Sequence, residues 1–289
     1  MGELCYITTC MGRLAHLQQS LPRIAGQAGV DCVVVDYSCP DGAGDWVEAN
    51  FPQVRVVRVE GETVFNRSRA RNLGAAAARA PWLGFFDADV LIAPGFAEAV
   101  LPMLKPGRYY RADPVTDQTH GALIVQRDAF EAFGGYDETY EGWGSEDIDI
   151  IDALEFEELK ADSFPGRLLS EIPHSDALRT QFQSLPDHWL QGQINSIYRG
   201  IKVDFRRLLR RQLTADEARP IYREVWRALR QAHEHDRYAP CWIKINLDEV
   251  ILISSPIFQP RTKTLVGRSV TYKVRLEKPA AEPAPQAGA

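Results

Sequence analysis

Residues 66–90, NRSRARNLGAAAARAPWLGFFDADV, join an alanine-rich segment to an apolar run that ends in two aspartates. Alanine has the highest helix propensity, which predicts a helix from Asn66, and WLGFF has the length and composition of a buried strand. A helix that leads directly into a strand is the repeating unit of α/β folds. This stretch therefore predicts an α/β protein in which Asp87 and Asp89 follow the end of a strand.

Three more apolar runs precede this stretch, each near the length of a buried strand: LCYITT at 4–9, CVVVDY at 32–37 and VRVVRV at 54–59. Between the first two, apolar residues recur at helical spacing. The alternation predicts a largely parallel sheet, and in such sheets ligands bind outside the carboxyl ends of the strands. Asp36 and Asp87 both follow or end a predicted strand, so we expect them near a bound ligand.

The two aspartates of FFDADV are one residue apart, so both side chains can leave the strand end on the same side. Mg²⁺ and Mn²⁺ prefer oxygen ligands and usually share their coordination shell with substrate phosphates. Asp87 and Asp89 therefore predict a site for Mn²⁺ or Mg²⁺ that a diphosphate completes. The same pattern also occurs by chance in solvated turns, but the apolar flanks of this one favour the functional interpretation.

A second acidic sequence, GWGSEDID, occupies residues 142–149. Its glycines allow close backbone approach around Trp143, whose flat face can stack on a sugar ring or pack into the core. Glu146, Asp147 and Asp149 follow at a predicted helix start, where the helix dipole favours negative charge. One carboxylate in this rigid position can instead remove a proton from an acceptor hydroxyl, and Asp147 is the candidate base.

The composition is that of a globular protein: 289 residues, 45% hydrophobic and 25% charged. A net charge of -6 argues against a broad nucleic-acid surface. Five cysteines without a CxxC pair indicate neither a disulfide framework nor a zinc site, and they fit a reducing compartment. The sequence contains no leader-like segment and no apolar run long enough to cross a membrane. We therefore expect a cytoplasmic protein.

The pattern changes after the second acidic sequence. Residues 176–238 are highly charged with helical spacing, and strand-like alternation begins at Cys241. The chain ends in KPAAEPAPQAGA, which has the composition of a disordered segment. We predict a catalytic domain over 1–185, a helical and strand extension over 186–276, and a disordered tail over 277–289.

Five motifs stand in order along the first part of the chain: ITTCMGR, VVDYSCPDG, NRSRARNLGAA, FFDADV and GWGSEDID. Together they resemble the GT-A glycosyltransferases, especially family 2 and the related β-1,4-galactosyltransferase and chondroitin-polymerase domains. The resemblance covers roughly residues 3–185. It implies the GT-A fold, a Rossmann-like α/β fold with a mainly parallel central sheet, and a nucleotide-sugar donor, with a UDP-sugar expected.

The resemblance also implies roles for individual residues. Asp87 and Asp89 match the pair that holds Mn²⁺ or Mg²⁺ on the diphosphate, and Asp147 matches the carboxylate that deprotonates the acceptor in inverting members. The residues implied to contact the nucleotide sugar are Thr8, Arg13, Asp36, Arg71 and Asp87. Those implied to contact the acceptor or the sugar are Trp143, Gly144 and Glu146. His174 is implied to be a third ligand of the metal.

Two departures from the family pattern concern the binding pockets. Tyr37 stands where many relatives have a second acid, and IIDALEFEEL follows SEDID where many have an arginine. The details of the nucleotide pocket and of the acceptor pocket are therefore expected to be atypical.

The resemblance implies a metal-dependent hexosyltransferase that moves a sugar from a nucleotide sugar to a glycan or other hydroxyl acceptor. The D-x-D pattern does not encode stereochemistry and leaves a retaining mechanism open, but the aspartate of the Glu146–Asp147 pair favours inversion. A sugar nucleotidyltransferase should show a Gly-rich phosphate loop near its N-terminus, which TTCMGR lacks. A noncatalytic carbohydrate-binding or scaffold protein on the same fold is the other alternative. FRRLLRR at 205–211 is typical of an exposed helix face and also allows peripheral contact with an anionic membrane. Oligomeric state stays open.

Overall fold

The computed structural model describes residues 2–116, 119–173, 181–185, 187–252 and 265–276. The chain divides into two compact units, Met1–Ala215 and Asp216–Ala289. The division lies beyond residue 185, where the sequence places the end of the catalytic domain, so the next long helix belongs to the first unit. The three-part division predicted from the sequence stays a prediction.

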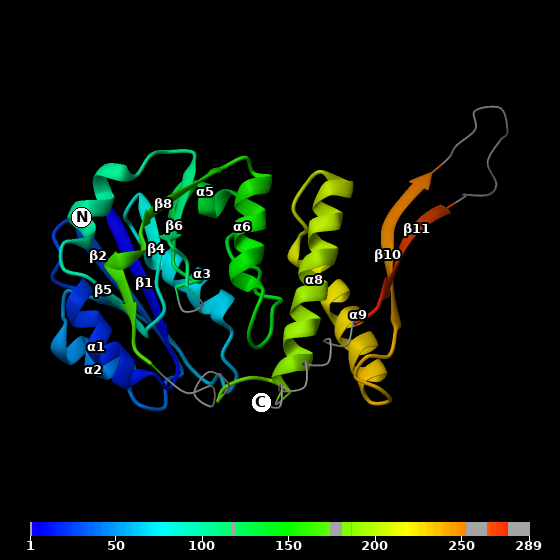
Figure 1. Ribbon diagram of the computed structural model, residues 1–289, viewed down its shortest axis with the longest axis horizontal. Helices are drawn as coiled ribbons and strands as arrows, with labels where there is room; N and C mark the ends of the chain where they lie inside the picture. The colour runs from blue at the N-terminus through cyan, green and yellow to red at the C-terminus, as the bar shows by residue number, and fades with distance from the viewer. Residues whose placement is uncertain (1, 117–118, 174–180, 186, 253–264, 277–289) are drawn as a thin grey trace, which may run out of the picture. The chain divides into compact units, whose positions relative to one another are not determined.

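A seven-stranded sheet forms the centre of the first unit, in the order β3-β2-β1-β4-β7-β6-β8 (Figure 1). The strands β3, β2, β1 and β4 pair in parallel, β7 is antiparallel to both neighbours, and β6 and β8 pair in parallel. The prediction of a mainly parallel sheet is confirmed. The strands are β1 (Leu4–Cys10), β2 (Val30–Tyr37), β3 (Arg55–Val59), β4 (Trp82–Phe85), β6 (Arg108–Asp113), β7 (Leu123–Gln126) and β8 (Lys160–Pro165).

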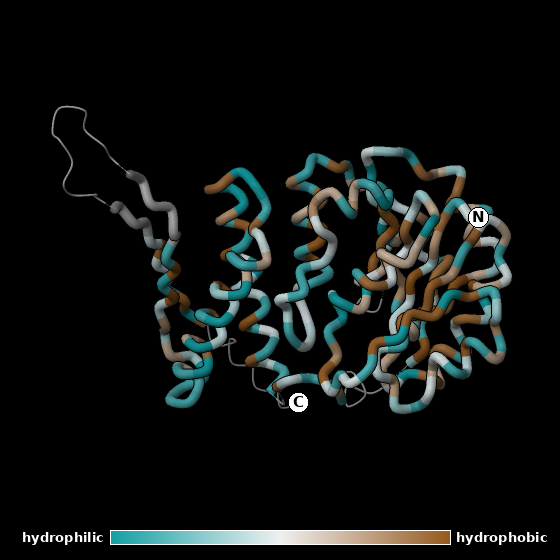
Figure 2. The backbone as a smooth tube through the Cα atoms, turned by 180° about the vertical axis from the view of Figure 1, so that it is seen from behind, coloured by the Kyte–Doolittle hydropathy of each residue, from teal (hydrophilic) through white to brown (hydrophobic). Residues whose placement is uncertain are grey.

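Helices cover both faces of this sheet, because successive side chains of a strand point to opposite sides. On one face, Tyr6 of β1 belongs to a core that includes Leu17 of α1. On the other, Ile7 belongs to a core that includes Ala70 of α3 and Leu154 of α6. Figure 2 shows the hydrophobic strands enclosed between more hydrophilic segments. The helices of the first unit are α1 (Leu14–Ile24), α2 (Ala43–Asn50), α3 (Arg67–Ala77), α4 (Phe96–Val100), α5 (Arg127–Ala132), α6 (Glu146–Phe156) and α8 (His188–Leu209).

The remaining small elements of this unit include a pair of short strands that begins just after the two aspartates. Strand β5 (Val90–Ile92), directly after FFDAD, pairs antiparallel with β9 (Leu169–Glu171). Two short 3-10 helices, η1 (Leu101–Met103) and η2 (Gly166–Leu168), complete the regular structure. The pairing of β5 with β9 carries the segment before residue 174 to the two aspartates.

The second unit contains α9 (Ala215–His233) and an antiparallel pair of strands, β10 (Cys241–Leu252) and β11 (Leu265–Val274). This agrees with the helical pattern up to residue 238 and the alternation from Cys241. Among the described residues, no helix is both long enough and apolar enough to span a membrane. The C-terminal residues 277–289, predicted to be disordered, lie outside the described residues.

Candidate active site

Helix α3 carries the arginines of the site. The Asn66 side chain caps its first turn by accepting a hydrogen bond from Arg69 N at 2.9 Å. In the third turn Gly74 lies so close to the sheet that a Cβ atom there would come within 2.4 Å of Ile7. The missing side chain allows α3 to lie directly on β1, and this close packing places Arg71 beside the ends of the strands.

Arg71 joins the two acidic sequences. Its Nη2 donates to Asp87 Oδ1 at 3.0 Å, and its Nη1 donates to Asp147 Oδ1. The guanidinium is buried, with 3% of the side chain exposed, whereas the Asp87 and Asp147 side chains are 34% and 23% exposed. Residues predicted to share a site from three separate motifs therefore meet around one cation.

The start of α6 is held by a second arginine. Arg67 Nη1 donates to Glu146 Oε1 at 2.7 Å, and Arg71 Nη1 lies 3.9 Å from the same oxygen. Gly144 has φ +101° and donates its N–H to Glu146 Oε2 at 3.1 Å, so a glycine here allows the turn into α6. We call Arg67, Arg71, Asp87, Glu146 and Asp147 the α3–α6 cluster.

The charges of this cluster shift the pKa values of its members in opposite directions. The protein surroundings oppose ionisation of Asp87, but the guanidinium groups of Arg71 and Arg67 outweigh this and hold the pKa of Asp87 below its usual value. Burial, and then the charge of Asp147, raise the pKa of Glu146 despite its two arginine neighbours. Compared with Glu146, Asp87 therefore keeps its negative charge more readily.

Arg67 carried no site prediction from the sequence, and neither did two further residues next to Arg71. Tyr136 places its ring 5.0 Å from the Arg71 Cζ atom, and its buried hydroxyl has no hydrogen-bond partner among the described residues. At Gly121 a Cβ atom would come within 2.9 Å of Arg71 Nη2 and 3.4 Å of the Asp147 carboxylate. Tyr136 and Gly121 lie outside the five motifs, so no sequence pattern pointed to them.

The residues predicted to contact the nucleotide lie at the ends of β1 and β2. Thr8 is buried, and its hydroxyl has no hydrogen-bond partner within the described part of the chain. Arg13 follows β1 and is near enough to Asp87 to lower the pKa of that carboxyl. Asp36 accepts the N–H groups of Cys39 and Gly44, each at 2.8 Å, so its carboxylate also shapes the loop into α2. Their contacts with a nucleotide stay predictions.

Trp143 does not pack into the core. The residue is 48% exposed, and among the described residues its carbonyl accepts a hydrogen bond from Asn195 Nδ2 at 3.1 Å. Of the two uses that the sequence left open, the exposed face of the ring agrees with the contact to a sugar or acceptor. That contact stays a prediction.

The donor set at the end of β4 fits a hard divalent cation. Asp87 and Asp89 offer carboxylate oxygens at partly exposed positions, and the Asp89 carbonyl accepts the Ile172 N–H at 2.9 Å. Among the described residues, no three His, Cys, Asp or Glu side chains are grouped as a metal site. Two carboxylates can hold a divalent cation only where oxygen atoms of the substrate complete its coordination shell. His174, the predicted third ligand, lies outside the described residues.

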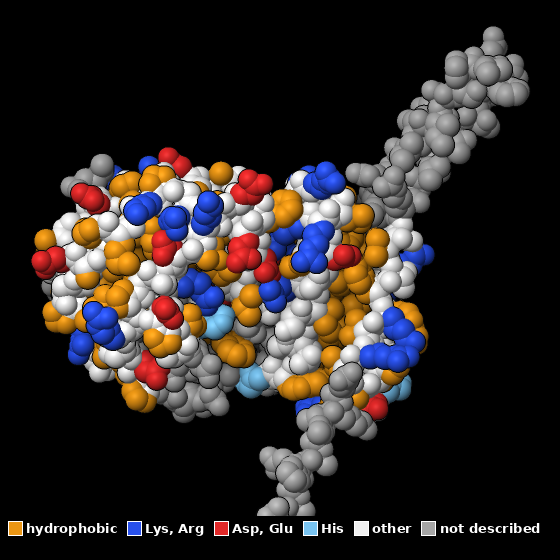
Figure 3. All heavy atoms as spheres, turned by 45° about the horizontal axis from the view of Figure 1, so that its top comes forward, with side chains coloured by type: hydrophobic (Ala, Val, Ile, Leu, Met, Phe, Trp, Pro, Cys, Tyr) orange, Lys and Arg blue, Asp and Glu red, His pale blue; other side chains and the backbone are white. Residues whose placement is uncertain are grey.

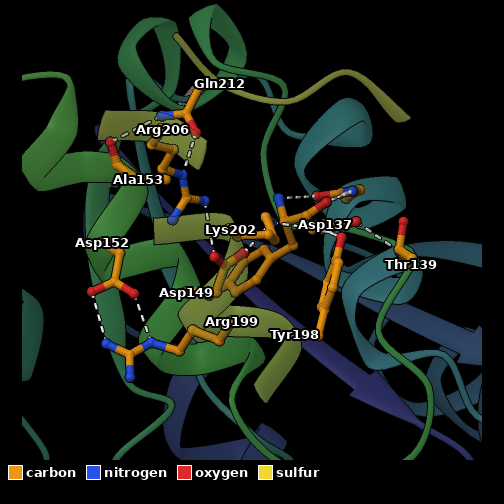
Figure 4. Close-up of polar contacts among 12 residues, drawn as sticks. Asp137, Thr139, Asp149, Asp152, Ala153, Tyr198, Arg199, Lys202, Arg206 and Gln212 are labelled. Carbon is orange, nitrogen blue, oxygen red and sulfur yellow. Dashed lines mark hydrogen bonds and ion pairs between the residues drawn. The ribbon is translucent and has the colours of Figure 1, made fainter. Parts of the chain in front are cut away.

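The other side of α6 carries a second set of charges, drawn in Figure 4. Lys202 Nζ lies between Asp137 Oδ2 and Asp149 Oδ2, 2.6 Å from each, and Arg206 Nη2 lies 2.9 Å from Asp149 Oδ1. Tyr198 also donates to Asp137 at 2.7 Å. We call Asp137, Asp149, Lys202 and Arg206 the α6–α8 cluster.

This second cluster separates the acids of GWGSEDID and changes one interpretation made from the sequence. Asp149 turns away from Asp147 toward α8, so each acid of GWGSEDID has its own cationic partner. Arg206 is 3% exposed and is therefore not on an exposed face of FRRLLRR, whereas Arg207 and Leu208 are exposed. Figure 3 shows basic and acidic side chains interspersed on the face drawn.

Two family models match the first part of the chain. The family model described as glycosyl transferase family 2 matches residues 6–141, and the one described as the N-terminal domain of galactosyltransferase matches residues 109–175. A search of curated proteins gave no significant match.

Solved structures share the fold at low sequence identity. The mannosyltransferase PcManGT from Pyrobaculum calidifontis, in complex with GDP-Man and Mn2+, is 17% identical with a TM-score of 0.51, over 76% of this chain and 68% of its own. TarS 1-349 from S. aureus is 11% identical with a TM-score of 0.52, over 92% of this chain and 98% of that one. A second TarS structure has a TM-score of 0.55 at 13% identity, over 82% of this chain and 43% of its own.

The fold and these matches define a glycosyltransferase of the GT-A fold. Within that class, residues 6–141 match the glycosyl transferase family 2 model, which confirms the resemblance carried by the five motifs.

Proposed function

We propose that this glycosyltransferase is metal-dependent and inverting, and that it transfers a sugar from a UDP-sugar to the hydroxyl group of a glycan or other acceptor. The observation that carries the proposal is the double contact of Arg71 with Asp87 and Asp147. Through this contact, one guanidinium binds both the acid proposed to serve the donor diphosphate, Asp87, and the acid proposed to serve the acceptor, Asp147.

The proposed base is Asp147. Its Oδ1 is held by Arg71, and no hydrogen bond to Oδ2 occurs among the described residues, so Oδ2 can accept the proton of an acceptor hydroxyl. The oxygen of that hydroxyl then attacks the anomeric carbon opposite the leaving nucleotide, and one displacement inverts the configuration. Arg71 fixes the carboxylate, while Tyr136 packs against the guanidinium and limits its movement.

Asp87 and Asp89 are proposed to hold Mn²⁺ or Mg²⁺ together with the diphosphate, with His174 as a further ligand. The bound cation would supply neutralising charge to the departing nucleotide diphosphate. Asp87 suits this role because its arginine neighbours keep it ionised. The Mn2+ in PcManGT supports the choice of a divalent cation.

The test is nucleotide release from a panel of nucleotide sugars, with manganese or with chelator. We expect manganese-dependent release from one donor, and its loss in Asp89→Asn. The matched control is Asp45→Asn, since Asp45 is 80% exposed and pairs with Arg58 far along the sequence from both acidic motifs. Equal loss in both variants, or release that survives the chelator, would contradict a metal site at Asp87 and Asp89.

The choice of uridine rests on Asp36, and the GDP-Man bound by PcManGT makes it worth testing separately. An ionised carboxylate offers about four acceptor positions, so two backbone N–H bonds leave room for a nucleobase N–H. Calorimetry with UDP, GDP and CDP in manganese should show the tightest binding for UDP. Tighter binding of GDP or CDP would refute the assignment of Asp36.

The cellular setting is part of the same proposal. We propose a cytoplasmic enzyme with peripheral membrane contact through Arg207, Leu208 and the arginines that follow, which are exposed. Sedimentation with vesicles containing anionic lipid, compared with neutral vesicles, tests that contact.

A further inference from the structure

Two of the five cysteines face each other where β1 and β2 end. The Sγ atoms of Cys10 and Cys39 lie 3.8 Å apart, and the Gly12 N–H donates to Cys39 Sγ at 3.3 Å. Cys10 is the last residue of β1 and is fully buried, whereas Cys39 is partly exposed in the loop between β2 and α2. The proposed transfer reaction uses neither thiol, so their arrangement requires another explanation.

The surroundings of Cys39 stabilise its thiolate. The hydrogen bond from Cys10 lowers the pKa of Cys39 most, burial raises it, and the N–H groups of Asp41, Gly12 and Ala43 lower it further, to about 6. A thiol with such a pKa is mostly ionised at neutral pH, and the thiolate is the form that attacks disulfides. The exposure of Cys39 provides the access that this attack needs.

The other cysteines lack these features. Burial raises the pKa of Cys5 and of Cys32 to about 12 and also raises that of Cys241, and all three side chains are buried. They are therefore protonated and shielded, and they serve as internal controls for any reagent that seeks a thiolate.

We propose that Cys39 and Cys10 form a dithiol site that reacts with low-molecular-weight disulfides and closes to a Cys10–Cys39 disulfide. The Cys39 thiolate attacks one sulfur of RSSR, the S–S bond breaks, and RS⁻ leaves, so that Cys39 carries a mixed disulfide. The Cys10 sulfur then attacks Cys39 Sγ, expels the second RS⁻ and gives its proton to it. With the proton that Cys39 had released, one RSSR is reduced to two RSH while two cysteine thiols are oxidised.

The disulfide would alter the loop that follows β1. Gly12 loses its thiolate partner, and this residue has φ +65° and lies where a Cβ atom would come within 2.3 Å of the Phe182 ring. The next residue, Arg13, is a proposed nucleotide contact. Oxidation is therefore expected to weaken UDP binding about fivefold, the effect of one lost hydrogen bond. This consequence rests on the proposed function, whereas formation of the disulfide does not.

The experiment maps the bond directly in the full chain. Reduced protein is treated with oxidised glutathione, its free thiols are blocked, and it is digested without reductant for mass spectrometry. We expect a peptide pair that joins Cys10 to Cys39 and separates in dithiothreitol, while Cys5, Cys32 and Cys241 are recovered as blocked thiols. A stable glutathione adduct on Cys39 beside an intact Cys10 thiol, or reaction at Cys5 or Cys32 instead, would overturn the proposal.

Variants separate the two steps. Cys10→Ser should retain the glutathione adduct on Cys39, and Cys39→Ser should leave Cys10 unmodified. Cys32→Ser, which removes another sheet cysteine, should form the disulfide as the wild type does. Calorimetry with UDP before and after oxidation then tests the consequence. No binding by the reduced protein would count against the proposed function, while the peptide map would still decide on the dithiol site.

Discussion

The two charged clusters that flank α6 contain similar side chains but differ in charge balance and in exposure to solvent. The α3–α6 cluster sets two arginines against three carboxylates, and two of those carboxylates, on Asp87 and Asp147, are 34% and 23% exposed. The α6–α8 cluster sets two cations against two carboxylates, with side-chain exposures between 4% and 13%. One cluster keeps excess negative charge open to solvent, and the other is balanced and closed.

This difference indicates what each cluster does. A buried ion pair is weak support for stability, yet removing one partner of such a pair is strongly destabilising. The α6–α8 cluster therefore fixes α6 against α8 and the turn at Asp137. With α6 fixed, Asp147 on its other side keeps a constant position next to Arg71, where its surplus charge can act on a substrate. The variants below are chosen to affect one cluster and spare the other.

The largest effect is expected from Asp147→Asn. An amide cannot accept the acceptor proton, so sugar transfer should fall by about 10²–10⁴-fold. Donor binding should persist, because Asp87, Asp89 and Arg71 remain. Steady-state transfer and UDP calorimetry give the two readouts. Asp152→Asn is the matched control, since Asp152 is on the same helix but pairs with Arg199 at 2.6 Å, away from the α3–α6 cluster. Similar losses in both variants would show that α6 needs its charges for structure alone.

The next largest effect is expected from Lys202→Met, which tests the structural role of the α6–α8 cluster. Methionine fills a similar volume but leaves Asp137 and Asp149 without their shared cation, so the free energy of unfolding should fall by about 3–5 kcal/mol. Urea unfolding measures this. Arg199→Met removes a more exposed partner, 32% accessible, and should cost about 1 kcal/mol or less. A smaller loss in Lys202→Met than in Arg199→Met would contradict the structural role of the α6–α8 cluster.

Most of the α3–α6 cluster could be predicted from the sequence, whereas the α6–α8 cluster could not. Apolar runs and the D-x-D pattern placed Asp87 at a strand end, and the order of the motifs placed Arg71 and Asp147 in one site, as the structure has them. Strand ends of a parallel sheet meet at one edge, so a local pattern there has a predictable spatial outcome.

Lys202 and Arg206 come from a helix that the sequence set apart as an extension. Their partners, Asp137 and Asp149, are more than fifty residues away, and helical spacing shows only which residues of α8 share a face. Which helix that face meets depends on tertiary packing. Tyr136 and Gly121 were missed for the same reason, because only the fold brings them to Arg71.

A smaller effect is expected from pH, and it should differ in sign between the two clusters. Burial opposes the charge of Asp137, but Lys202 outweighs it and lowers the pKa of this carboxyl. Its stabilising contribution is therefore present above the unfolded value of 3.8 and is lost as pH falls through the folded pKa. Glu146 has a raised pKa, so its contribution is present below the unfolded value of 4.5 and is lost as pH rises through the folded pKa.

Urea unfolding of Asp137→Asn and Glu146→Gln over this pH range tests both signs. The stability advantage of the wild type over Asp137→Asn should grow as pH rises, and that over Glu146→Gln should shrink. Two slopes of the same sign would contradict the difference between the clusters.

The smallest effect concerns Trp143, at the open edge of the α3–α6 cluster. Trp143 is 48% exposed, so Trp143→Ala should leave the free energy of unfolding and UDP affinity nearly unchanged. If the ring packs on the acceptor, its loss should raise the acceptor KM about three- to tenfold, the equivalent of about 0.7–1.4 kcal/mol of aromatic contact. Trp242→Ala is the matched control, because Trp242 is 57% exposed and belongs to the other unit. An acceptor KM that changes equally in both variants, or in neither, would remove Trp143 from the acceptor site and leave the open cluster without an aromatic contact at its edge.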